Sequence, residues 1–205
     1  MDLKVEFDKF YESRFGKQEL LFRLFYSFPI GIRFEIGKSN TRVYDEEYVK
    51  NACRRAITIF SELFDNDDTI FVVVNSFEDD PNDLAGDVAS DVLSLISHQN
   101  KCKFPFNSQE EEDFSCTRHI VQTFVKDIQI EKLIENIIWS DIDGRNNLKG
   151  CVYFINPKNN IIYWLYDDRG LDVISNEKTN LNPIYIKFNS WILNYDREKI
   201  DRVFA

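Results

Sequence analysis

The sequence predicts an α+β fold: a single domain in which a mixed or antiparallel sheet ends in a C-terminal hairpin meander and is covered by amphipathic helices. The chain of 205 residues is 43% hydrophobic and has no Pro-, Gly- or Ser-rich linker, so residues 1–205 can bury one core. Its 18 Phe, nine Tyr and three Trp supply the large rings that fill such a core. Segments with strand periodicity and with helical periodicity are interleaved, which favours helices packed on a sheet.

The first half of the chain contains three predicted helices and two predicted strands. Apolar Ile32, Phe34 and Ile36 alternate with polar residues, which is the pattern of a half-buried strand over 31–37. A strand over 69–77 has apolar residues on both faces and is expected in the middle of the sheet. Helices are expected over about 3–15, over a segment that Asp45 caps and that ends near Asp65, and over about 84–97.

The second half contains a predicted three-stranded meander. The segments CVYFI (151–155) and IIYWLY (161–166) flank the turn-rich NPKNN and should pair as an antiparallel hairpin. The DDRG turn (167–170) leads into a third strand, LDVI, with Gly170 free to adopt a positive φ. A strand is also expected over 117–125 and a helix over about 130–139. A further helix is expected with Asn182 as N-cap and Pro183 at its first position, and it should pack through Ile184, Phe188, Trp191 and Ile192. Asp196 is expected to cap a last helix.

Both histidines of the chain and two of its four cysteines occur within residues 98–119. His98, Cys102, Cys116 and His119 have a spacing that tetrahedral zinc permits. No glycine stands beside either ligand pair to form the tight turn that wraps a structural zinc, and a large aromatic core needs no metal to fold. We therefore predict a loop here rather than a zinc site, and no cofactor.

Three carboxylates at predicted strand ends form a second candidate site. Asp167 and Asp168 follow one strand and Glu35 closes another, an arrangement that could hold a divalent metal as nucleases do. Asp167 or Asp168 could equally accept hydrogen bonds from backbone amides in an ordinary turn, which is the interpretation that we favour. Glycine-rich phosphate loops and the common hydrolase motifs do not occur in the sequence, so it favours a protein that is not an enzyme.

The chain is acidic, with 35 Asp and Glu against 25 Lys and Arg and a formal net charge of −10. Such a surface repels phosphate backbones, which argues against nucleic-acid binding. The candidate binding residues are acidic residues in turn-rich segments and the DDRG turn: Asp79, Asp80, Glu110, Glu111, Glu112, Asp168 and Arg169. The acidic segments could be solvated loops that maintain solubility, or a surface that attracts a basic protein partner.

No export signal and no membrane span is predicted. The N-terminus alternates charged and aromatic residues, and the apolar runs are shorter than the roughly 20 residues that cross a bilayer. The four cysteines include no C-x-x-C pair, which indicates reduced thiols. We expect a cytoplasmic protein without membrane contact, and the sequence does not determine its oligomeric state.

The residues from 152 to 204 carry a resemblance to a known family. VYFINPKNNIIYWLYDDRGLDVIS, followed by LNPIYIKFNSWILNYDREKIDRVF, resembles the C-terminal end of DUF3885, a bacterial family of unknown function. GIRFEIG and the helix after it resemble the N-terminal part of the family more loosely. Phe188 stands where a tyrosine is common, a ring-for-ring change. The resemblance implies no activity and no catalytic residue.

Three functions remain open. The first is a non-catalytic protein-binding module of the immunity or antitoxin type, which neutralises a basic bacterial toxin by occlusion; small acidic bacterial proteins of this general build resemble such proteins at the level of the fold. The second is a metal-dependent hydrolase or nuclease that uses Glu35, Asp167 and Asp168. The third is a structural or regulatory domain. The sequence favours the first.

Overall fold

The structure is a computed structural model of the chain, and it describes residues 2–37, 45–77, 88–97, 100–110, 115–143 and 150–205. Its strands are β1 (Gly31–Glu35), β2 (Thr69–Ser76), β3 (Asn100–Asn107), β4 (Ser115–Phe124), β5 (Gly150–Asn156), β6 (Ile161–Leu165) and β7 (Gly170–Ser175). Its helices are α1 (Leu3–Phe15), α2 (Leu24–Ser27), α3 (Glu46–Leu63), α4 (Val88–Ser94), α5 (Ile130–Asp143), α6 (Lys178–Lys187) and α7 (Arg197–Phe204).

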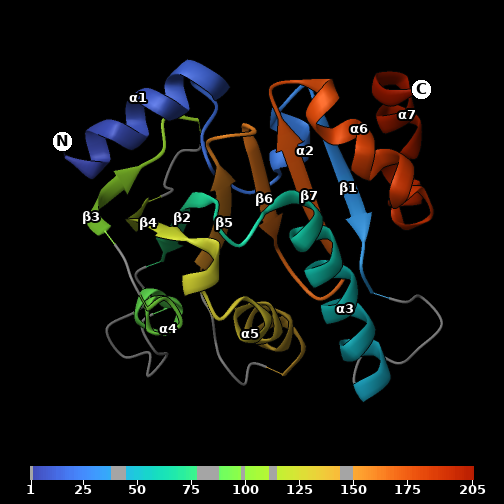
Figure 1. The fold of residues 1–205 in the computed structure, drawn as a ribbon, viewed down its shortest axis with the longest axis horizontal. Helices are drawn as coiled ribbons and strands as arrows, with labels where there is room; N and C mark the ends of the chain where they lie inside the picture. The colour runs from blue at the N-terminus through green and yellow to red at the C-terminus, as the bar shows by residue number, and fades with distance from the viewer. Residues whose placement is uncertain (1, 38–44, 78–87, 98–99, 111–114, 144–149) are drawn as a thin grey trace.

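The seven strands of the described residues form one antiparallel sheet with the order β1-β7-β6-β5-β2-β4-β3. The edge strands β1 and β3 lie at opposite ends of the sheet in Figure 1. The predicted α+β fold with a C-terminal meander is confirmed, because β5, β6 and β7 pair in sequence order. β7 then pairs with β1, so that Gly31 lies opposite Ile174. Every pairing is antiparallel, so the sheet is not mixed.

β2 lies inside the sheet, between β4 and β5, as its two apolar faces predict. Val72 and Val74 belong to the hydrophobic cluster on one face, whereas Phe71 and Val73 belong to the cluster on the other. Side chains of a strand alternate between the two faces, so a strand that is apolar throughout needs cover on both. The sheet is therefore the middle layer of three.

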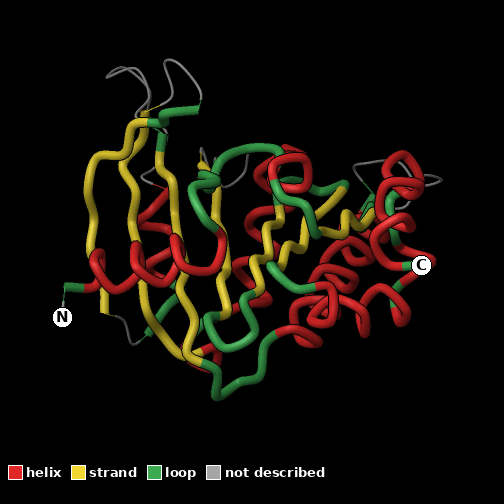
Figure 2. The backbone as a smooth tube through the Cα atoms, turned by 90° about the horizontal axis from the view of Figure 1, so that it is seen from above, coloured by secondary structure: helices red, strands yellow, loops and turns green. Residues whose placement is uncertain are grey.

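Helices cover both faces of the sheet. The larger hydrophobic cluster joins one face to α3, α4, α5, α6 and α7, and the smaller cluster joins the opposite face to α1 and to part of α2. In Figure 1, α1 lies at the β3 end of the sheet and α6 and α7 lie beside β1 at the other end. Figure 2 shows α1 running across the strands. The two ends of the sheet are thus covered by the two ends of the chain.

α3 shows how the sequence pattern produces this cover. Its buried residues recur at helical spacing: Tyr48, Val49, Ala52, Ala56, Ile59, Phe60 and Leu63. The Phe60 ring stacks on Phe64 with a centroid distance of 4.4 Å and meets Tyr163 of β6 edge-on at 5.4 Å. The Tyr163 hydroxyl donates to the Ala56 carbonyl at 3.1 Å, so this buried phenol is satisfied by the helix that it packs against.

Two other predicted helices occur with different limits. α4 covers Val88–Ser94 of the predicted segment 84–97, and residues 84–87 lie outside the described residues. α5 continues past its predicted end near residue 139 to Asp143. No described helix combines the length and the apolar character needed to cross a lipid bilayer.

The stretch that we predicted to be a loop contains an edge strand, so that prediction was wrong. β3 pairs along its whole length with β4. Cys102, Phe104 and Phe106 are half-buried and alternate with exposed residues, which is strand periodicity. Pro105 has no N–H to donate, but an edge strand tolerates a proline because one side of its backbone has no neighbouring strand.

The C-terminal helix begins earlier than predicted. α6 starts at Lys178, so Pro183 lies inside the helix and Asn182 is not its N-cap. A proline inside a helix removes one backbone hydrogen bond. The helix persists because Leu181, two residues before the proline, and Ile184, directly after it, are buried in the core.

The apolar residues after α6 do not continue one helix, as we had expected. Phe188 and Trp191 stack with a centroid distance of 4.9 Å across a 3-10 turn. Ile192 then forms a β-bridge with Phe34 of β1. The helix therefore ends at Lys187, and the apolar side chains that follow pack along the edge strand β1.

Candidate functional site

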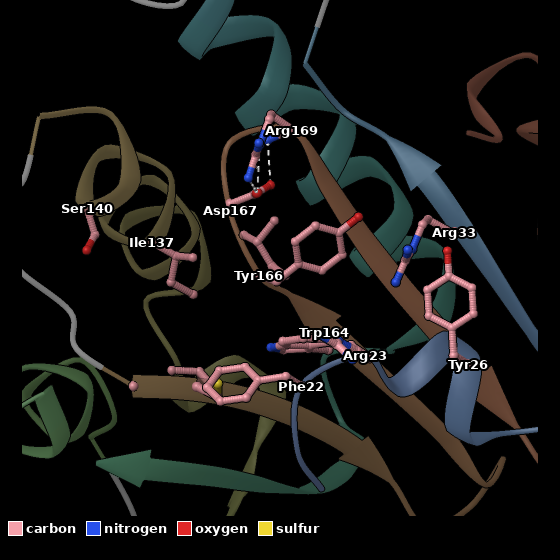
Figure 3. A pocket seen from close by; sticks show the side chains of 14 residues that line it. Phe22, Arg23, Tyr26, Arg33, Ile137, Ser140, Trp164, Tyr166, Asp167 and Arg169 are labelled. Atoms are coloured by element: carbon pink, nitrogen blue, oxygen red, sulfur yellow. Dashed lines mark hydrogen bonds and ion pairs between the residues drawn. The ribbon is translucent and has the colours of Figure 1, made fainter. Parts of the chain in front are cut away.

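The C-terminal meander opens at one end and leaves a cavity. The described pairing of β5 with β6 ends at Tyr153↔Trp164. Beyond this pair the two strands separate, because β5 stays paired with β2 and β6 stays paired with β7. A cavity of about 720 Å³ lies at this opening. Its lining comes from α2 and the residues before it, from β1, from the open strand ends, from the DDRG turn and from α5 (Figure 3): Phe22, Arg23, Tyr26, Arg33, Ile137, Ser140, Gly150, Cys151, Val152, Trp164, Leu165, Tyr166, Asp167 and Arg169.

Aromatic rings make up much of the cavity wall. Trp164 is 5% exposed, and its ring centroid lies 5.1 Å from that of Tyr166. Phe22 and Tyr26 come from the other side, in and before α2, and are partly exposed at the mouth. Burial raises the pKa of Tyr166, so its phenol is neutral at physiological pH. These rings therefore offer flat, apolar faces to the cavity.

A buried ion-pair network lies beside the cavity. Arg33 donates from Nε and Nη2 to the two carboxylate oxygens of Asp172, at 2.7 and 3.0 Å. Its Nη1 lies 3.4 Å from Asp196, which also accepts a hydrogen bond of 2.9 Å from the Tyr26 hydroxyl. Burial raises the pKa of Asp172, and the bonds from Arg33 oppose that effect. Asp196, which we expected to cap α7 with its side chain, makes no capping hydrogen bond and uses its carboxylate in this network instead.

The DDRG turn lines the cavity on another side. Asp167 accepts hydrogen bonds from the backbone N–H groups of Arg169 and Gly170, at 2.8 and 3.0 Å, and from the Arg169 guanidinium. Asp168 is 2% exposed and accepts from the Tyr48 hydroxyl of α3. Both carboxylates thus have the hydrogen-bonded roles of an ordinary turn.

Gly170 does not have the positive φ that we expected. Among the described glycines, the positive φ belongs to Gly16. A Cβ at Gly170 would lie 2.2 Å from the Tyr166 hydroxyl oxygen and 3.1 Å from the Phe34 carbonyl oxygen. Glycine is required here because Tyr166 and the backbone of β1 approach it closely.

The three strand-end carboxylates lie at the same end of the sheet without forming a common cluster. Glu35 pairs in register with Gly170, which places it beside the turn. Asp168 is held against α3 by Tyr48, and Asp167 is held by the amides of its own turn. Among the residues that the structure describes, no group of three or more His, Cys, Asp and Glu side chains could hold a metal ion.

Most of the acidic candidate binding residues, namely Asp79, Asp80, Glu111 and Glu112, lie outside the described residues. Glu110 is described and exposed, and its N–H donates to the Ser108 hydroxyl at 3.0 Å. Asp168 is too deeply buried to contact a partner at the surface. The Arg169 side chain, by contrast, is 75% exposed and lines the cavity.

The described residues of the zinc pattern do not share a face of the sheet. His98 lies outside the described residues. Cys102 is opposite Ile120 and packs with it in the cluster under α1, and Cys116 has the same parity along β4. His119 is offset by one residue and lines a groove beside α4. Cys102 also borders this groove, but the register places the side chains of His119 and the two cysteines on opposite faces of the sheet.

Some of the remaining site residues have a signal in the sequence. Asp172 is a lone charge within the apolar strand LDVI, and Arg33 is a charge within GIRFEIG. Opposite charges in two apolar strands can indicate that the strands are neighbours. For Arg23 and Trp164 we find no such signal, because nothing in the pattern places the α2 segment opposite β6.

Fold and site together define an α+β protein built on one antiparallel sheet, with a cavity where its C-terminal hairpin opens. The sequence matches the family described as Domain of unknown function (DUF3885) over residues 7–196, and the chain belongs to that family. It is similar to the uncharacterized protein YnaE of Bacillus subtilis (strain 168), with 24% identity over 203 residues that cover 90% of this chain and 95% of YnaE. No solved structure matches the chain significantly. The resemblance inferred from the C-terminal residues is thus confirmed.

Proposed function

We propose that this protein is a non-catalytic protein-binding module of the immunity or antitoxin type, which neutralises a bacterial toxin by covering it. The observation that carries the proposal is a set of three exposed rings, two of which, Phe22 and Tyr26, line the cavity. Phe22, Tyr26 and Tyr195, here called the aromatic rim, are 41%, 48% and 86% exposed. Exposed aromatic side chains next to arginines contribute most of the free energy in many protein–protein interfaces.

The Tyr26 part of the aromatic rim is held in place before any partner binds. The Tyr26 hydroxyl is bonded to Asp196, and the Arg33 and Lys199 cations lie 4.8 and 4.9 Å from its ring centroid. Tyr195 precedes Asp196 directly in the chain. Side chains that are ordered in the free protein lose little conformational entropy on binding, which favours affinity.

The strand-end carboxylates weigh against the hydrolase alternative. A general base or a metal ligand needs a carboxylate that is accessible in a cleft. Asp167 is occupied by Arg169 and two amides, and Asp168 is buried against Tyr48. A binding module makes no demand on either group.

The charge of the chain indicates the kind of partner. A formal net charge of −10 favours the long-range approach of a basic toxin domain and disfavours nucleic acid as a partner, whereas the aromatic rim, which Arg33 and Lys199 flank, contributes apolar contact. Occlusion of a toxin inside the producing cell implies a cytoplasmic location and no membrane contact. The third alternative, a structural or regulatory domain, predicts no toxin partner and is separated by the experiment below.

The experiment is co-expression with each protein encoded beside its gene. We expect one neighbour to arrest growth of a bacterial host, this protein to restore growth, and the pair to form a 1:1 complex in size-exclusion chromatography. Inhibition of the toxin should saturate at equimolar ratio, because occlusion is stoichiometric whereas an enzyme would act below it.

Variants locate the contact. Phe22→Ala and Tyr195→Ala should each weaken the complex about tenfold or more by calorimetry. Ile186→Ala removes a side chain that is 74% exposed on α6, outside the aromatic rim, and should leave affinity unchanged. The proposal fails if no neighbour is neutralised, or if the rim variants bind as the wild type does.

A further inference from the structure

The cavity has features of a ligand site that protein binding at the aromatic rim does not require. It lies where β5 and β6 separate, and its volume of about 720 Å³ is within the range of small-molecule sites, roughly 300–1,000 Å³. Such sites combine apolar and aromatic walls with a few convergent polar groups. Trp164 and Tyr166 form the wall on the sheet side and Phe22 the wall on the α2 side (Figure 3).

One polar atom of the wall is buried without a protein partner. The indole nitrogen of Trp164 makes no hydrogen bond to any described residue, although the side chain is 95% buried. An unsatisfied buried donor costs about 1–3 kcal/mol, and tryptophan N–H groups usually find an acceptor when buried. An N–H group can donate but cannot accept, so the missing group is a hydrogen-bond acceptor.

The arginines of the cavity differ in how their charge is balanced. Arg33 is paired with Asp172, and Arg169 with Asp167. The Arg23 guanidinium makes no hydrogen bond or ion pair with any described residue, although it lines the same cavity. Among the described residues it is thus the cation of the cavity that no carboxylate balances, in a chain whose formal net charge is negative.

The backbone at Arg23 supports a specific role for this residue. Arg23 has φ 68° and ψ 35°, in the left-handed region that residues other than glycine rarely adopt. Such strain costs on the order of 1–3 kcal/mol and is concentrated at functional sites. The conformation positions the start of α2, and with it Arg23 and Phe22, at the cavity.

Charge also decides which ligand fits. Aromatic walls can enclose a cation, but a cation would here meet the Arg23 guanidinium, whereas the nearby described carboxylates are already bonded, Asp167 to Arg169 and both Asp172 and Asp196 to Arg33. An anion would meet the unbalanced Arg23, and its oxygens would accept from the Trp164 N–H. The aromatic wall would at the same time stack on a flat ring.

We propose that the cavity binds a small ligand that carries an aromatic ring and an anionic group, either a carboxylate or a phosphate. The ring lies against Trp164 and Phe22, and the anion is bound by Arg23 and the indole N–H of Trp164. This site goes beyond the proposed function and does not depend on it, because it is a property of the free protein.

The experiment is calorimetric titration of the isolated protein with pairs of defined probes. Adenosine 5′-monophosphate and guanosine 5′-monophosphate test the phosphate, with adenosine and guanosine as uncharged partners. Indole-3-acetate and 4-hydroxybenzoate test the carboxylate, with indole and phenol as uncharged partners. We expect saturable binding of at least one anion with a Kd below about 100 μM, at least tenfold tighter than its uncharged partner.

Two variants test the assigned contacts. Arg23→Ala and Trp164→Phe should each weaken that binding about tenfold or more, since a hydrogen bond to a charged group is lost in both. Arg23 is exposed and its replacement should leave folding intact, so this variant remains decisive if Trp164→Phe is unstable. Arg202→Ala, which removes an exposed arginine of α7, should bind as the wild type does.

The proposal is overturned if none of the aromatic anions binds saturably with a Kd below about 100 μM. It is equally overturned if the uncharged partners bind as tightly, or if Arg23→Ala and Trp164→Phe retain wild-type affinity. A negative result here leaves the toxin experiment untouched, because that experiment measures a protein complex and includes Tyr195, which does not line the cavity.

Discussion

Replacing Arg33 by methionine should strongly destabilise the fold. Methionine replaces the apolar stem of arginine with an unbranched side chain, but it lacks the two guanidinium N–H donors that bind Asp172. Asp172 has no exposed surface, so in the folded wild-type protein its carboxylate depends on protein donors and not on solvent. One donor would remain near it, the backbone N–H of Phe25 at 3.2 Å.

The size of the effect follows from this geometry. Breaking a buried ion pair by removal of one partner costs about 3–5 kcal/mol, because the other charge stays buried without compensation. We expect Arg33→Met to lower the free energy of unfolding within that range. In the double variant Arg33→Met/Asp172→Leu no uncompensated carboxylate remains, so its cost should be well below the sum of the two single variants.

The assay is urea unfolding at pH 7, followed by tryptophan fluorescence and circular dichroism, with the m-values compared between variants. Arg202→Met is the matched control. Its ion pair with Glu198 has side chains that are 75% and 82% exposed, so the free energy of unfolding should change by about 0.5 kcal/mol or less. A loss below about 1 kcal/mol for Arg33→Met, or additive effects in the double variant, would refute the reasoning.

Three further predictions concern other parts of the fold. Burial raises the pKa of Asp68, but hydrogen bonds from Lys158 and other donors outweigh burial and lower this pKa below the ordinary value of 3.8. The ionised carboxylate therefore stabilises the fold above pH 3.8, and this stabilisation is lost as the pH falls through the lowered pKa. Asp68→Asn should therefore cost about 1–2 kcal/mol at pH 7 and less at about pH 2.5 in urea unfolding; an equal cost at both would contradict this. Gly170→Ala should cost about 1–3 kcal/mol in the same assay because its Cβ would overlap Tyr166, and a neutral effect would show that the ring moves freely. Burial raises the pKa of the Cys151 thiol to about 12. At pH 8, iodoacetamide should therefore alkylate Cys151 at least about 100-fold more slowly in the native protein than in the unfolded protein, as followed by mass spectrometry. Equal rates would count against a buried thiol.

The parts of the fold that could be predicted are those encoded by local patterns. The β5–β6 hairpin follows from two apolar runs around a short polar turn, and α3 follows from an apolar stripe of helical period. The stretch around Pro105 was predicted as a loop, and Pro183 was predicted at the first position of its helix rather than inside it. In the structure, pairing at a sheet edge and burial in the core outweigh the local preference of proline.

The candidate site could be predicted less well because distant residues form it. The DDRG turn was found from its own sequence, but Arg33 and Asp172 are 139 residues apart and meet through the β1–β7 pairing. Trp164 could have faced either side of the sheet, since a shift of one residue reverses a strand. The cavity itself depends on the residue at which the β5–β6 pairing ends. Neither the amino-acid composition nor the hydrophobic periodicity of the two strands predicts that residue.

Both margins of the sheet are protected against pairing with another chain. Along β1, the segment after α6 supplies a bond from the Leu193 N–H to the Arg33 carbonyl at 2.9 Å. Along β3, Pro105 withholds a donor, and the exposed Lys101 and Lys103 add charge. Natural proteins use these devices to prevent aggregation through strand addition. Recognition of another macromolecule by this fold must therefore proceed through side chains, not through main-chain extension of the sheet.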